Sequence, residues 1–416
     1  MNTGMRNKIL FIPDSFWGTD SGHRSSQYLL KAFNKINIDV AVYASSEFYS
    51  EKQREDLIAF KYEFYEQTPY SFKQNLFKRK IKKEFIQIVE SFRPDYVLYM
   101  GTIRNKITMD FCSEMGLEYF YLPLTTEYYC VKHFAALDNG PCFKCLHGSY
   151  LNSIKNRCLG PKYNLPKYLK GILLTFISKK RILRAKGILG YSHDQLSMLE
   201  AYGVNRGNTI KTSIFFDHDT INTTSISAGD YFVCSGQLTT AKGWHLIPQI
   251  IRNTPGIKYK LIFLNEENAQ RFVLENNLEK QQKSGYLDIV YGVENHQDVL
   301  DIFANARGIL VPSYYATTGE FTLLEALGLG KPVILFNAGV HREVIVHRKN
   351  AMMANVGDLA AYCRHIVEVA ANDDLAMELS AGGQQLYQEL TSFDFFRSSM
   401  NDLFPAQVNL ERQQAP

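Results

Sequence analysis

Two kinds of segment alternate along this chain from its N-terminus to its C-terminus. Short continuous apolar runs, typical of strands covered on both faces, are followed by longer segments with apolar residues at helical spacing. The runs lie at residues 8–12, 40–44, 96–100, 118–122, 187–191, 231–235, 258–263, 287–291, 308–311 and 333–336. This alternation predicts an α/β fold in which crossover helices connect the strands of parallel sheets.

A polar stretch over residues 212–224 interrupts the pattern, and we interpret it as a linker. With 416 residues, 45% of them hydrophobic, the chain can form two sizeable cores. We therefore expect two doubly wound, Rossmann-like domains at residues 1–213 and 214–392. Residues 393–416 begin with a last helix, which could pack on either domain.

The segment from Tyr314 to Glu343 carries the clearest candidate chemistry. Thr317, Thr318 and Gly319 form a predicted turn rich in hydroxyl groups and free amides, and a helix follows. The unpaired N–H groups and positive dipole of a helix start suit a phosphate. Glu325, one and a half turns into that helix, can accept two hydrogen bonds from a ribose. This combination predicts a site for a nucleoside diphosphate.

A second block precedes the first by about 75 residues. The strand from Tyr231 runs into a loop that contains Gln237 and Lys242, and a helix follows from Trp244. A lysine at this place offers a compact positive charge to two phosphates. The alternative is a lysine at a helix start whose side chain is simply solvated.

The two blocks resemble the donor site of retaining GT-B glycosyltransferases, the family called glycosyltransferase family 4. Residues 325–327 (Glu-Ala-Leu) and 330–334 (Gly-Lys-Pro-Val-Ile) match the second half of its signature. The resemblance implies two domains facing across a cleft, with residues 393–416 crossing back to the first. It also implies a metal-independent, hexosyltransferase-like transfer from a nucleotide-diphosphate sugar to a glycan or a lipid-linked glycan, as in polysaccharide or surface-glycan synthesis.

Three residues usual in that family are replaced here. Thr317 stands in place of the first glutamate, with Glu320 as the nearest carboxylate, and Gln237 stands in place of an arginine. The third is a histidine, and residues 124–127 (Leu-Thr-Thr-Glu) stand in its place. Glu127 is therefore a candidate site residue. The resemblance assigns catalysis to Lys242, Glu320 and Thr317. A catalytically inactive partner protein that keeps the fold is the alternative.

The loop after the first strand resembles another part of the family's site. Gly22 would let the donor approach the backbone, and it is followed by His23 and Arg24. The resemblance implies that Gly22, Gln237, Lys242, Thr318, Gly319 and Glu325 bind the donor. It places His23, Arg24 and Glu127 on the acceptor side.

Four of the seven cysteines, Cys130, Cys142, Cys145 and Cys158, cluster in one segment. A Cys-x-x-Cys pair with one flanking cysteine on each side is typical of structural zinc. Residues 130–158 also resemble the insert of a subset of family 4. We expect a structural zinc site, with His133 and His147 as substitute ligands. Reduced free thiols or a disulfide are the alternatives, the disulfide being disfavoured in the cytosol.

Two basic segments carry aromatic and aliphatic residues, at residues 72–85 and 162–186. Either could rest on an anionic membrane surface, or could be a helix with a buried apolar face and a solvated basic one. The net charge of +4 is weak, and without a nucleic-acid-binding module we expect no such partner. The first strand starts without an apolar leader, and no run reaches a membrane span, so we expect a cytoplasmic protein.

Overall fold

A computed structural model of the chain describes residues 8–14, 21–36, 38–45, 63–67, 74–104, 106–138, 140–161, 164–212, 221, 229–293, 295–314 and 320–400. The chain divides into two compact units. Unit 1 comprises Met1–Phe134, Phe143–Phe215 and Phe393–Pro416, and unit 2 comprises Ala135–Cys142 and Phe216–Ser392.

Unit 1 is built on a seven-stranded sheet with the strand order β3-β2-β1-β4-β5-β8-β9. All of its strand pairs are parallel. The strands are β1 (Lys8–Ile12), β2 (Asp39–Ser45), β3 (Glu63–Gln67), β4 (Tyr96–Gly101), β5 (Tyr119–Pro123), β8 (Gly187–Gly190) and β9 (Thr209–Lys211). The strands β1, β4 and β5 are adjacent and parallel, so the loops that follow them leave from the same edge of the sheet. Ligands bind at this edge in such sheets.

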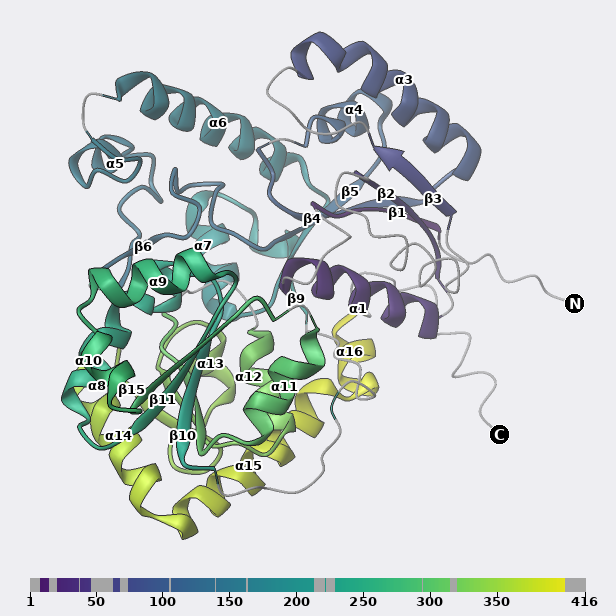
Figure 1. The fold of residues 1–416 in the computed structure, drawn as a ribbon. Coiled ribbons are helices and arrows are strands. Elements are labelled where there is room, and N and C mark those ends of the chain that lie inside the picture. The colour runs from purple at the N-terminus through teal and green to yellow at the C-terminus, as the bar shows by residue number, and fades with distance from the viewer. Residues whose placement is uncertain are drawn as a thin grey trace, which may run out of the picture. The chain divides into compact units, whose positions relative to one another are not determined.

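The helices of unit 1 connect these strands or flank the sheet (Figure 1). They are α1 (Ser21–Lys35), α3 (Gln74–Phe92), α4 (Thr108–Met115), α5 (Leu151–Lys155), α6 (Leu165–Arg184), α7 (His193–Tyr202) and α16 (Phe393–Met400). Residues 187–202 form a unit of strand, cap and helix. Ser192 caps α7, since its hydroxyl accepts a hydrogen bond from the backbone N–H of Gln195.

Unit 2 is built on a six-stranded parallel sheet with the order β12-β11-β10-β13-β14-β15. The strands are β10 (Tyr231–Ser235), β11 (Lys258–Phe263), β12 (Leu287–Tyr291), β13 (Gly308–Val311), β14 (Val333–Phe336) and β15 (Met352–Ala354). Every residue of β13 and β14 is buried, as expected where helices cover both faces of a parallel sheet.

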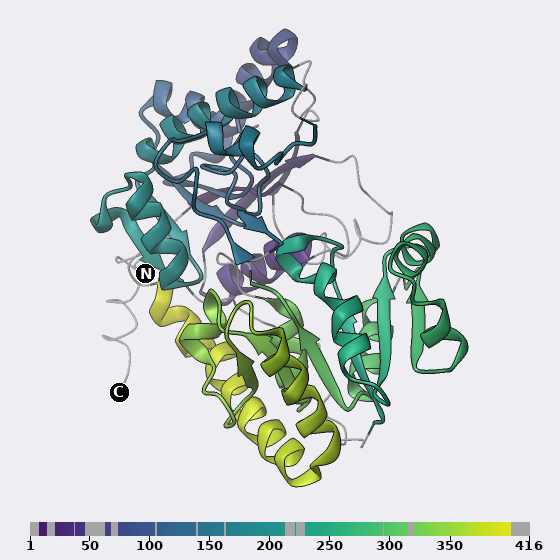
Figure 2. The same ribbon diagram turned by 90° about the vertical axis from the view of Figure 1, so that its left-hand side faces the viewer.

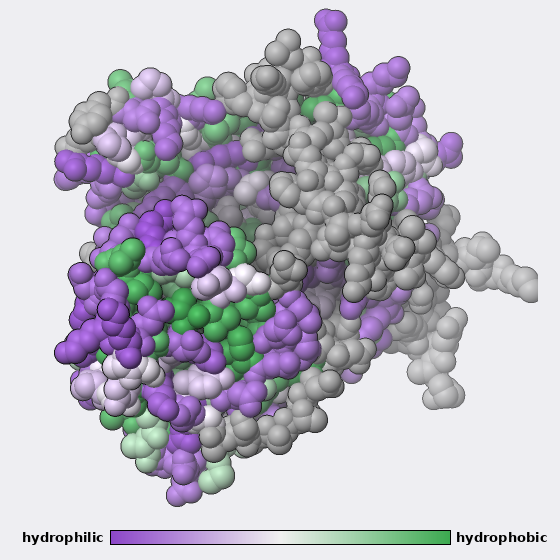
Figure 3. Space-filling model, in the orientation of Figure 1, coloured by the Kyte–Doolittle hydropathy of each residue, from purple (hydrophilic) through white to green (hydrophobic). Residues whose placement is uncertain are grey.

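The helices of unit 2 lie on both faces of this sheet (Figures 1 and 2). They are α8 (Ile247–Asn253), α9 (Glu266–Glu275), α10 (Glu279–Lys283), α11 (His296–Ala304), α12 (Phe321–Gly328), α13 (Val340–Val344), α14 (Leu359–Ala371) and α15 (Asp373–Thr391). Hydrophilic residues cover much of α9 in the space-filling view (Figure 3). Its Ala269, Phe272 and Val273 are buried.

The predicted α/β class is confirmed, and each of the ten predicted runs contains a strand. The strands β3, β9 and β15 were not predicted. Each lies at a sheet edge, β9 and β15 have only three residues, and β3 carries few apolar residues. Most of the predicted linker lies outside the described residues. The predicted domain bounds stay a prediction, since compactness does not show that a unit folds by itself.

One short hairpin groups with unit 2, although the predicted bounds place it in the first domain. The strands β6 (Ala136–Leu137) and β7 (Gly140–Pro141) pair antiparallel and group with unit 2, although they lie inside the predicted cysteine insert of the first domain. The Tyr314 hydroxyl donates a hydrogen bond to the carbonyl of Leu137 (2.8 Å). His245 Nε2 lies 2.8 Å from the carbonyl oxygen of Asp138. These polar contacts, which no pattern in the sequence indicates, hold the hairpin on unit 2.

Candidate functional site

The loop after β10 places Lys242 at the carboxyl end of the central strand of unit 2. Residues Thr240–Lys242 form a 3₁₀ turn, and the hydroxyl of Thr239 accepts a hydrogen bond from the backbone N–H of Lys242 (3.3 Å). The chain then turns at Gly243 with φ of 73°. The local sequence, a threonine cap and a glycine stop, thus fixes where the lysine side chain starts.

The same loop is fastened to the segment that follows β13. The backbone N–H of Tyr314 (3.2 Å) and the hydroxyl of Ser313 (3.3 Å) both donate to the carbonyl of Ala241. A Cβ atom at Gly243 would lie 2.1 Å from the carbonyl oxygen of Pro312. The two loops therefore pack backbone against backbone, which only glycine permits at this position.

A buried carboxylate binds the Lys242 side chain. Glu320 immediately precedes α12, and its Oε1 lies 2.6 Å from Lys242 Nζ. The Glu320 side chain is 5% exposed, whereas that of Lys242 is 32% exposed. The ion pair is therefore open to solvent on the lysine side only. An ammonium group has three protons to donate, so Lys242 can contact a further anion without leaving Glu320.

A histidine from a third element contacts the same carboxylate. His341 lies in α13 after β14, and its Nε2 is 3.4 Å from Glu320 Oε2. Its Nδ1 donates to the carbonyl of Phe336 (3.0 Å), which orients the ring. Burial alone would raise the pKa of Glu320, but the charge of Lys242 and the contact with His341 hold that pKa well below its ordinary value. Glu320 is therefore ionised at neutral pH.

A second buried carboxylate lies further along α12. Glu325 is 2% exposed, and its Oε1 is 3.0 Å from Nε2 of His296, the first residue of α11. The contact joins the helix that follows β12 to the helix that follows β13. Of these two buried carboxylates, one immediately precedes α12 and the other lies within it. Each is next to a positively charged or ionisable side chain from another part of unit 2.

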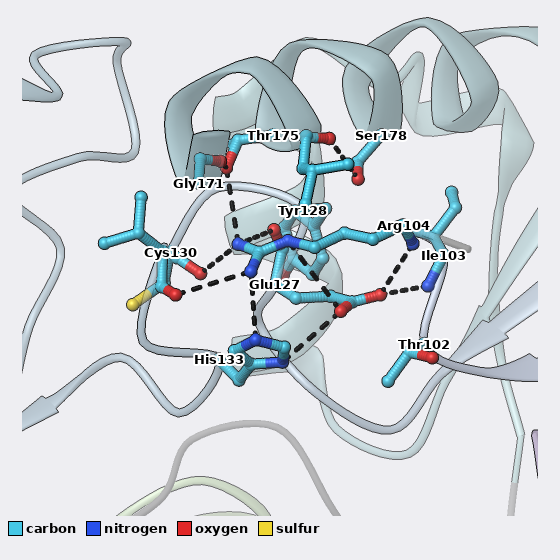
Figure 4. A network of polar contacts seen from close by, with 12 residues as sticks. Thr102, Ile103, Arg104, Glu127, Tyr128, Cys130, His133, Gly171, Thr175 and Ser178 are labelled. Atoms are coloured by element: carbon cyan, nitrogen blue, oxygen red, sulfur yellow. Dashed lines mark hydrogen bonds and ion pairs between the residues drawn. The ribbon is translucent and has the colours of Figure 1, made fainter. Parts of the chain in front are cut away.

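Unit 1 has its own buried polar network, at the ends of β4 and β5 (Figure 4). Glu127 is 1% exposed, and its Oε1 accepts hydrogen bonds from the backbone N–H groups of Ile103 and Arg104. Its Oε2 lies 3.3 Å from His133 Nδ1. The carboxylate therefore connects the loop after β4 to the loop after β5.

Arg104 completes this network. Its guanidinium donates to the carbonyl oxygens of Glu127 (3.0 Å) and Cys130 (2.8 Å), and to the hydroxyl of Thr175 on α6 (3.3 Å). Its Nη1 lies 2.9 Å from His133 Nε2. Because an arginine only donates, Nε2 is the acceptor and the ring proton sits on Nδ1, facing Glu127.

The surroundings in this network shift the pKa values of Glu127 and His133. Burial, with the nearby carboxylate of Asp14, raises the pKa of Glu127 to about 7, although Arg104 and the two backbone donors act in the opposite direction. Burial and the charge of Arg104 lower the pKa of His133 to about 4. The imidazole is therefore neutral at neutral pH.

The structure gives the predicted zinc site no support. Among the described residues, which include all four, no group of three or more His, Cys, Asp and Glu side chains is positioned to hold a metal ion. Cys142 belongs to unit 2, whereas the other three belong to unit 1. The Cys145 thiol instead donates to the carbonyl of Ser149 (3.9 Å). No disulfide is formed by the seven cysteines, all of which are described.

Comparison with protein families gives one match, to the family described as glycosyl transferases group 1, over residues 222–386. Unit 2 carries a glycosyl transferases group 1 domain. The match covers the loop with Lys242, helix α12 with both of its carboxylates, and the contacting histidines. No curated protein matches the sequence.

Solved structures match nearly the whole chain at low identity. HepE of Anabaena, in complex with UDP and glucose, is 13% identical over 96% of this chain and 100% of its own, with a TM-score of 0.67. Sucrose-phosphate synthase of Thermosynechococcus elongatus is 12% identical over 97% of this chain and 100% of its own, with a TM-score of 0.68. The lipopolysaccharide outer core galactosyltransferase WaaB is 14% identical over 96% of this chain and 99% of its own, with a TM-score of 0.62. These matches show the GT-B fold.

The predicted donor residues are only partly brought together in the group 1 domain. Lys242 and Glu320 are in contact, and Glu325 follows in the same helix. Gln237 is exposed in the loop before Lys242. Thr317, Thr318 and Gly319 lie outside the described residues.

The predicted residues of unit 1 lie in two places. Gly22, His23 and Arg24 belong to the first turn of α1, where the position of the His23 side chain is not described. Glu127 was predicted to face an acceptor, but its carboxylate is buried and holds two loops together. Its contact with an acceptor stays a prediction.

Sequence reasoning missed the two histidines that contact Glu320 and Glu325, and the arginine of unit 1. His296 and His341 lie 29 residues before Glu325 and 21 residues after Glu320, and they reach these carboxylates only through the order of the strands. Arg104 follows β4 without any local pattern around it. The one available signal was position, since all three follow the carboxyl end of a strand.

Replacing Gly243 by alanine tests the packing of the Lys242 loop. We expect Gly243→Ala to lower the free energy of unfolding by about 2–4 kcal/mol, from positive-φ strain and the clash with Pro312. Gly256→Ala is the matched control, because Gly256 also has positive φ but a Cβ there meets no atom within 4 Å. Equal losses in urea unfolding of the two variants would contradict the close packing.

The pH dependence of stability tests the His133 contacts. An unfolded histidine gains a proton near pH 6.5, whereas His133 in the folded chain gains one only near pH 4. At this histidine the unfolded state thus binds more protons between these values, and the contribution of His133 to stability falls as pH drops from 6.5 to 4. We expect His133→Gln to remove this pH-dependent contribution. The difference in Tm between the wild type and His133→Gln should therefore shrink towards pH 4. An unchanged difference between pH 7 and pH 4.5 would contradict the buried neutral imidazole.

Proposed function

We propose that this protein is a retaining glycosyltransferase of the family 4 type, which transfers a sugar from a nucleotide-diphosphate donor to a glycan or a lipid-linked glycan. One observation carries the proposal. In the group 1 domain, Lys242 is held by the buried Glu320 at the start of α12, and Glu325 lies in the same helix. A cation, a helix start and a buried carboxylate are the groups that a nucleoside diphosphate requires.

Lys242 would stabilise the leaving diphosphate. In the proposed reaction the bond from the sugar's anomeric carbon to the diphosphate breaks, and the acceptor oxygen bonds to that carbon from the same face. The acceptor's proton passes to the departing phosphate oxygen. Negative charge grows on the diphosphate as the bond breaks, so a fixed ammonium group lowers the barrier. The open side of the Lys242–Glu320 pair leaves donors for this contact.

Glu320 would act as a positioning residue. Its carboxylate holds the ammonium group of Lys242 and is itself oriented by His341. Because Glu320 stays ionised, it holds the ammonium group of Lys242 at the start of α12. This assignment offers a substitute for the family glutamate that Thr317 replaces.

Glu325 would bind the ribose, with His296 holding its carboxylate in place. A carboxylate has room for several donors, so the contact with His296 leaves lone pairs for ribose hydroxyls. UDP is the first nucleotide to test, because the similar HepE structure contains UDP. A surface-glycan acceptor is supported by the likeness to a lipopolysaccharide galactosyltransferase.

The competing proposal is an inactive partner protein. Thr317, Gln237 and residues 124–127 replace three family residues, which favours this alternative. An inactive partner would bind a nucleotide at most and would not turn over a sugar donor. A screen of UDP, GDP and ADP sugars for hydrolysis and transfer separates the two proposals.

Two substitutions test the proposed roles. We expect Lys242→Met to lower turnover of the donor by tens- to thousand-fold, because one charge-stabilising donor is lost. We expect Glu325→Gln to raise the Kd for the nucleotide about tenfold or more, because the ribose loses a charged acceptor. The measurements are turnover and isothermal titration with the nucleotide that raises the Tm most.

Lys258→Met is the control, since Lys258 pairs with Asp230 on the surface of the same domain. It should leave turnover and affinity within about twofold of the wild type. Wild-type turnover in Lys242→Met would remove this residue from the mechanism. Unchanged nucleotide affinity in Glu325→Gln would do the same for the ribose contact.

A further inference from the structure

Helix α6 turns a row of large apolar side chains outward from unit 1. Leu165, Leu169, Leu173, Phe176 and Leu183 are each about half exposed, between 48% and 61%. Their spacing of three, four and seven residues places them on one side of the helix. We call them the leucine row. Apolar residues lie among hydrophilic ones along α6 in the space-filling view (Figure 3).

The buried side of α6 carries both large and small residues: Tyr168, Gly171, Thr175, Ser178, Arg181 and Ile182. The hydroxyls of Thr175 and Ser178 donate to backbone carbonyls one turn earlier, at 2.9 and 2.8 Å. This side packs on unit 1, and the large side chains of the leucine row lie outside it. Packing on unit 1 therefore does not explain the leucine row.

The other basic segment shows the ordinary arrangement. Helix α3 buries Ile81, Phe85 and Ile88, and it exposes Lys78 and Lys83. For this helix the simpler of the two predicted alternatives holds, an apolar face in the core and a solvated basic face. Of the two basic segments, α6 is thus the one that exposes a row of large apolar side chains.

Positive charges surround the leucine row. Residues 165–184 contain six lysines and arginines and no aspartate or glutamate. Lys167, Lys170, Lys180 and Arg184 are exposed on α6, next to or within the row. A surface with apolar residues ringed by cations complements a lipid surface with anionic headgroups. It complements the apolar surface of a protein less well.

The apolar surface continues beyond α6. The rings of Phe176 and Tyr150 pack edge to face, with centroids 5.3 Å apart. Leu151, directly after Tyr150, is 79% exposed. The first turn of α5 thus extends the leucine row.

Helix α6 is firmly attached to unit 1 from its inner side. Arg181 Nη2 donates to Asp110 Oδ2 (2.8 Å), and Arg181 Nη1 donates to the carbonyls of Ile103 (3.0 Å) and Arg104 (2.8 Å). Thr175 accepts a hydrogen bond from Arg104 in the network of Figure 4. The leucine row is therefore presented on a fixed support, and it need not fold on binding.

We propose that the leucine row and its flanking basic residues dock unit 1 on the surface of an anionic lipid membrane. Among the described helices none is long and apolar enough to cross a membrane, so α6 would lie in the headgroup region. Docking would bring the enzyme to a lipid-linked acceptor, which deepens the proposed function. The docking surface itself is independent of the donor site, because the two lie in different units.

Co-sedimentation of the full chain with vesicles tests the proposal. The vesicles contain phosphatidylcholine alone or phosphatidylcholine and phosphatidylglycerol at about three to one. We expect binding to the anionic vesicles that falls at least tenfold at high salt or without the anionic lipid. Leu169→Gln combined with Leu173→Gln should weaken that binding at least tenfold, because it removes apolar area and keeps every charge.

Charge is tested by Lys167→Glu combined with Lys170→Glu, which should weaken binding to anionic vesicles at least tenfold. Lys78→Glu combined with Lys83→Glu on α3 is the matched control, since it changes net charge equally and lies outside the leucine row. The control should lose less than threefold. Circular dichroism and Tm show whether each variant is folded, and nucleotide binding reports separately on the donor site.

Three results would overturn the proposal. The wild-type chain could fail to sediment with anionic vesicles, or the α6 variants could bind as the wild type does. In the third, the α6 variants would change a dimer into a monomer without any vesicle binding, which would make α6 an interface between copies. None of these results bears on sugar transfer, so the proposed function would be tested separately.

Discussion

The buried carboxylate of Glu320 is the constraint on which the candidate site depends. It lies at the start of α12 and binds Lys242 from the loop after β10, next to His341 from the helix after β14. An ionised carboxylate without partners in an apolar interior would cost several kcal/mol. Three separate segments are therefore held together at the carboxyl ends of three parallel strands, the edge at which ligands bind in sheets of this kind.

The same physical device recurs in unit 1. There Glu127 is buried between two loops and is bound by two backbone N–H groups, with His133 and Arg104 on its other side. Arg104 carries the connection on to α6 through Thr175. Buried charge thus shapes the loops in each unit, and the network of unit 1 supports the helix that carries the leucine row.

Much of the fold could be predicted from sequence, because buried parallel strands leave continuous apolar runs. Lys242 and Glu325 could be found by their local patterns. The roles of Glu127, His296 and His341 could not, since their partners lie far along the chain and meet only through strand order. The zinc prediction used spacing alone, and the structure gives it no support because spacing does not fix how Cys142 is placed. Which side of α6 is buried also could not be predicted, because leucines and lysines alternate around the whole helix.

The most direct test of the central claim is a crystal structure of the full chain with the nucleoside diphosphate that stabilises it most. Our account predicts a phosphate oxygen within hydrogen-bond distance of Lys242 Nζ, with Glu320 still paired and the ribose hydroxyls on Glu325. A nucleotide bound elsewhere, with Lys242 contacting only Glu320, would contradict it.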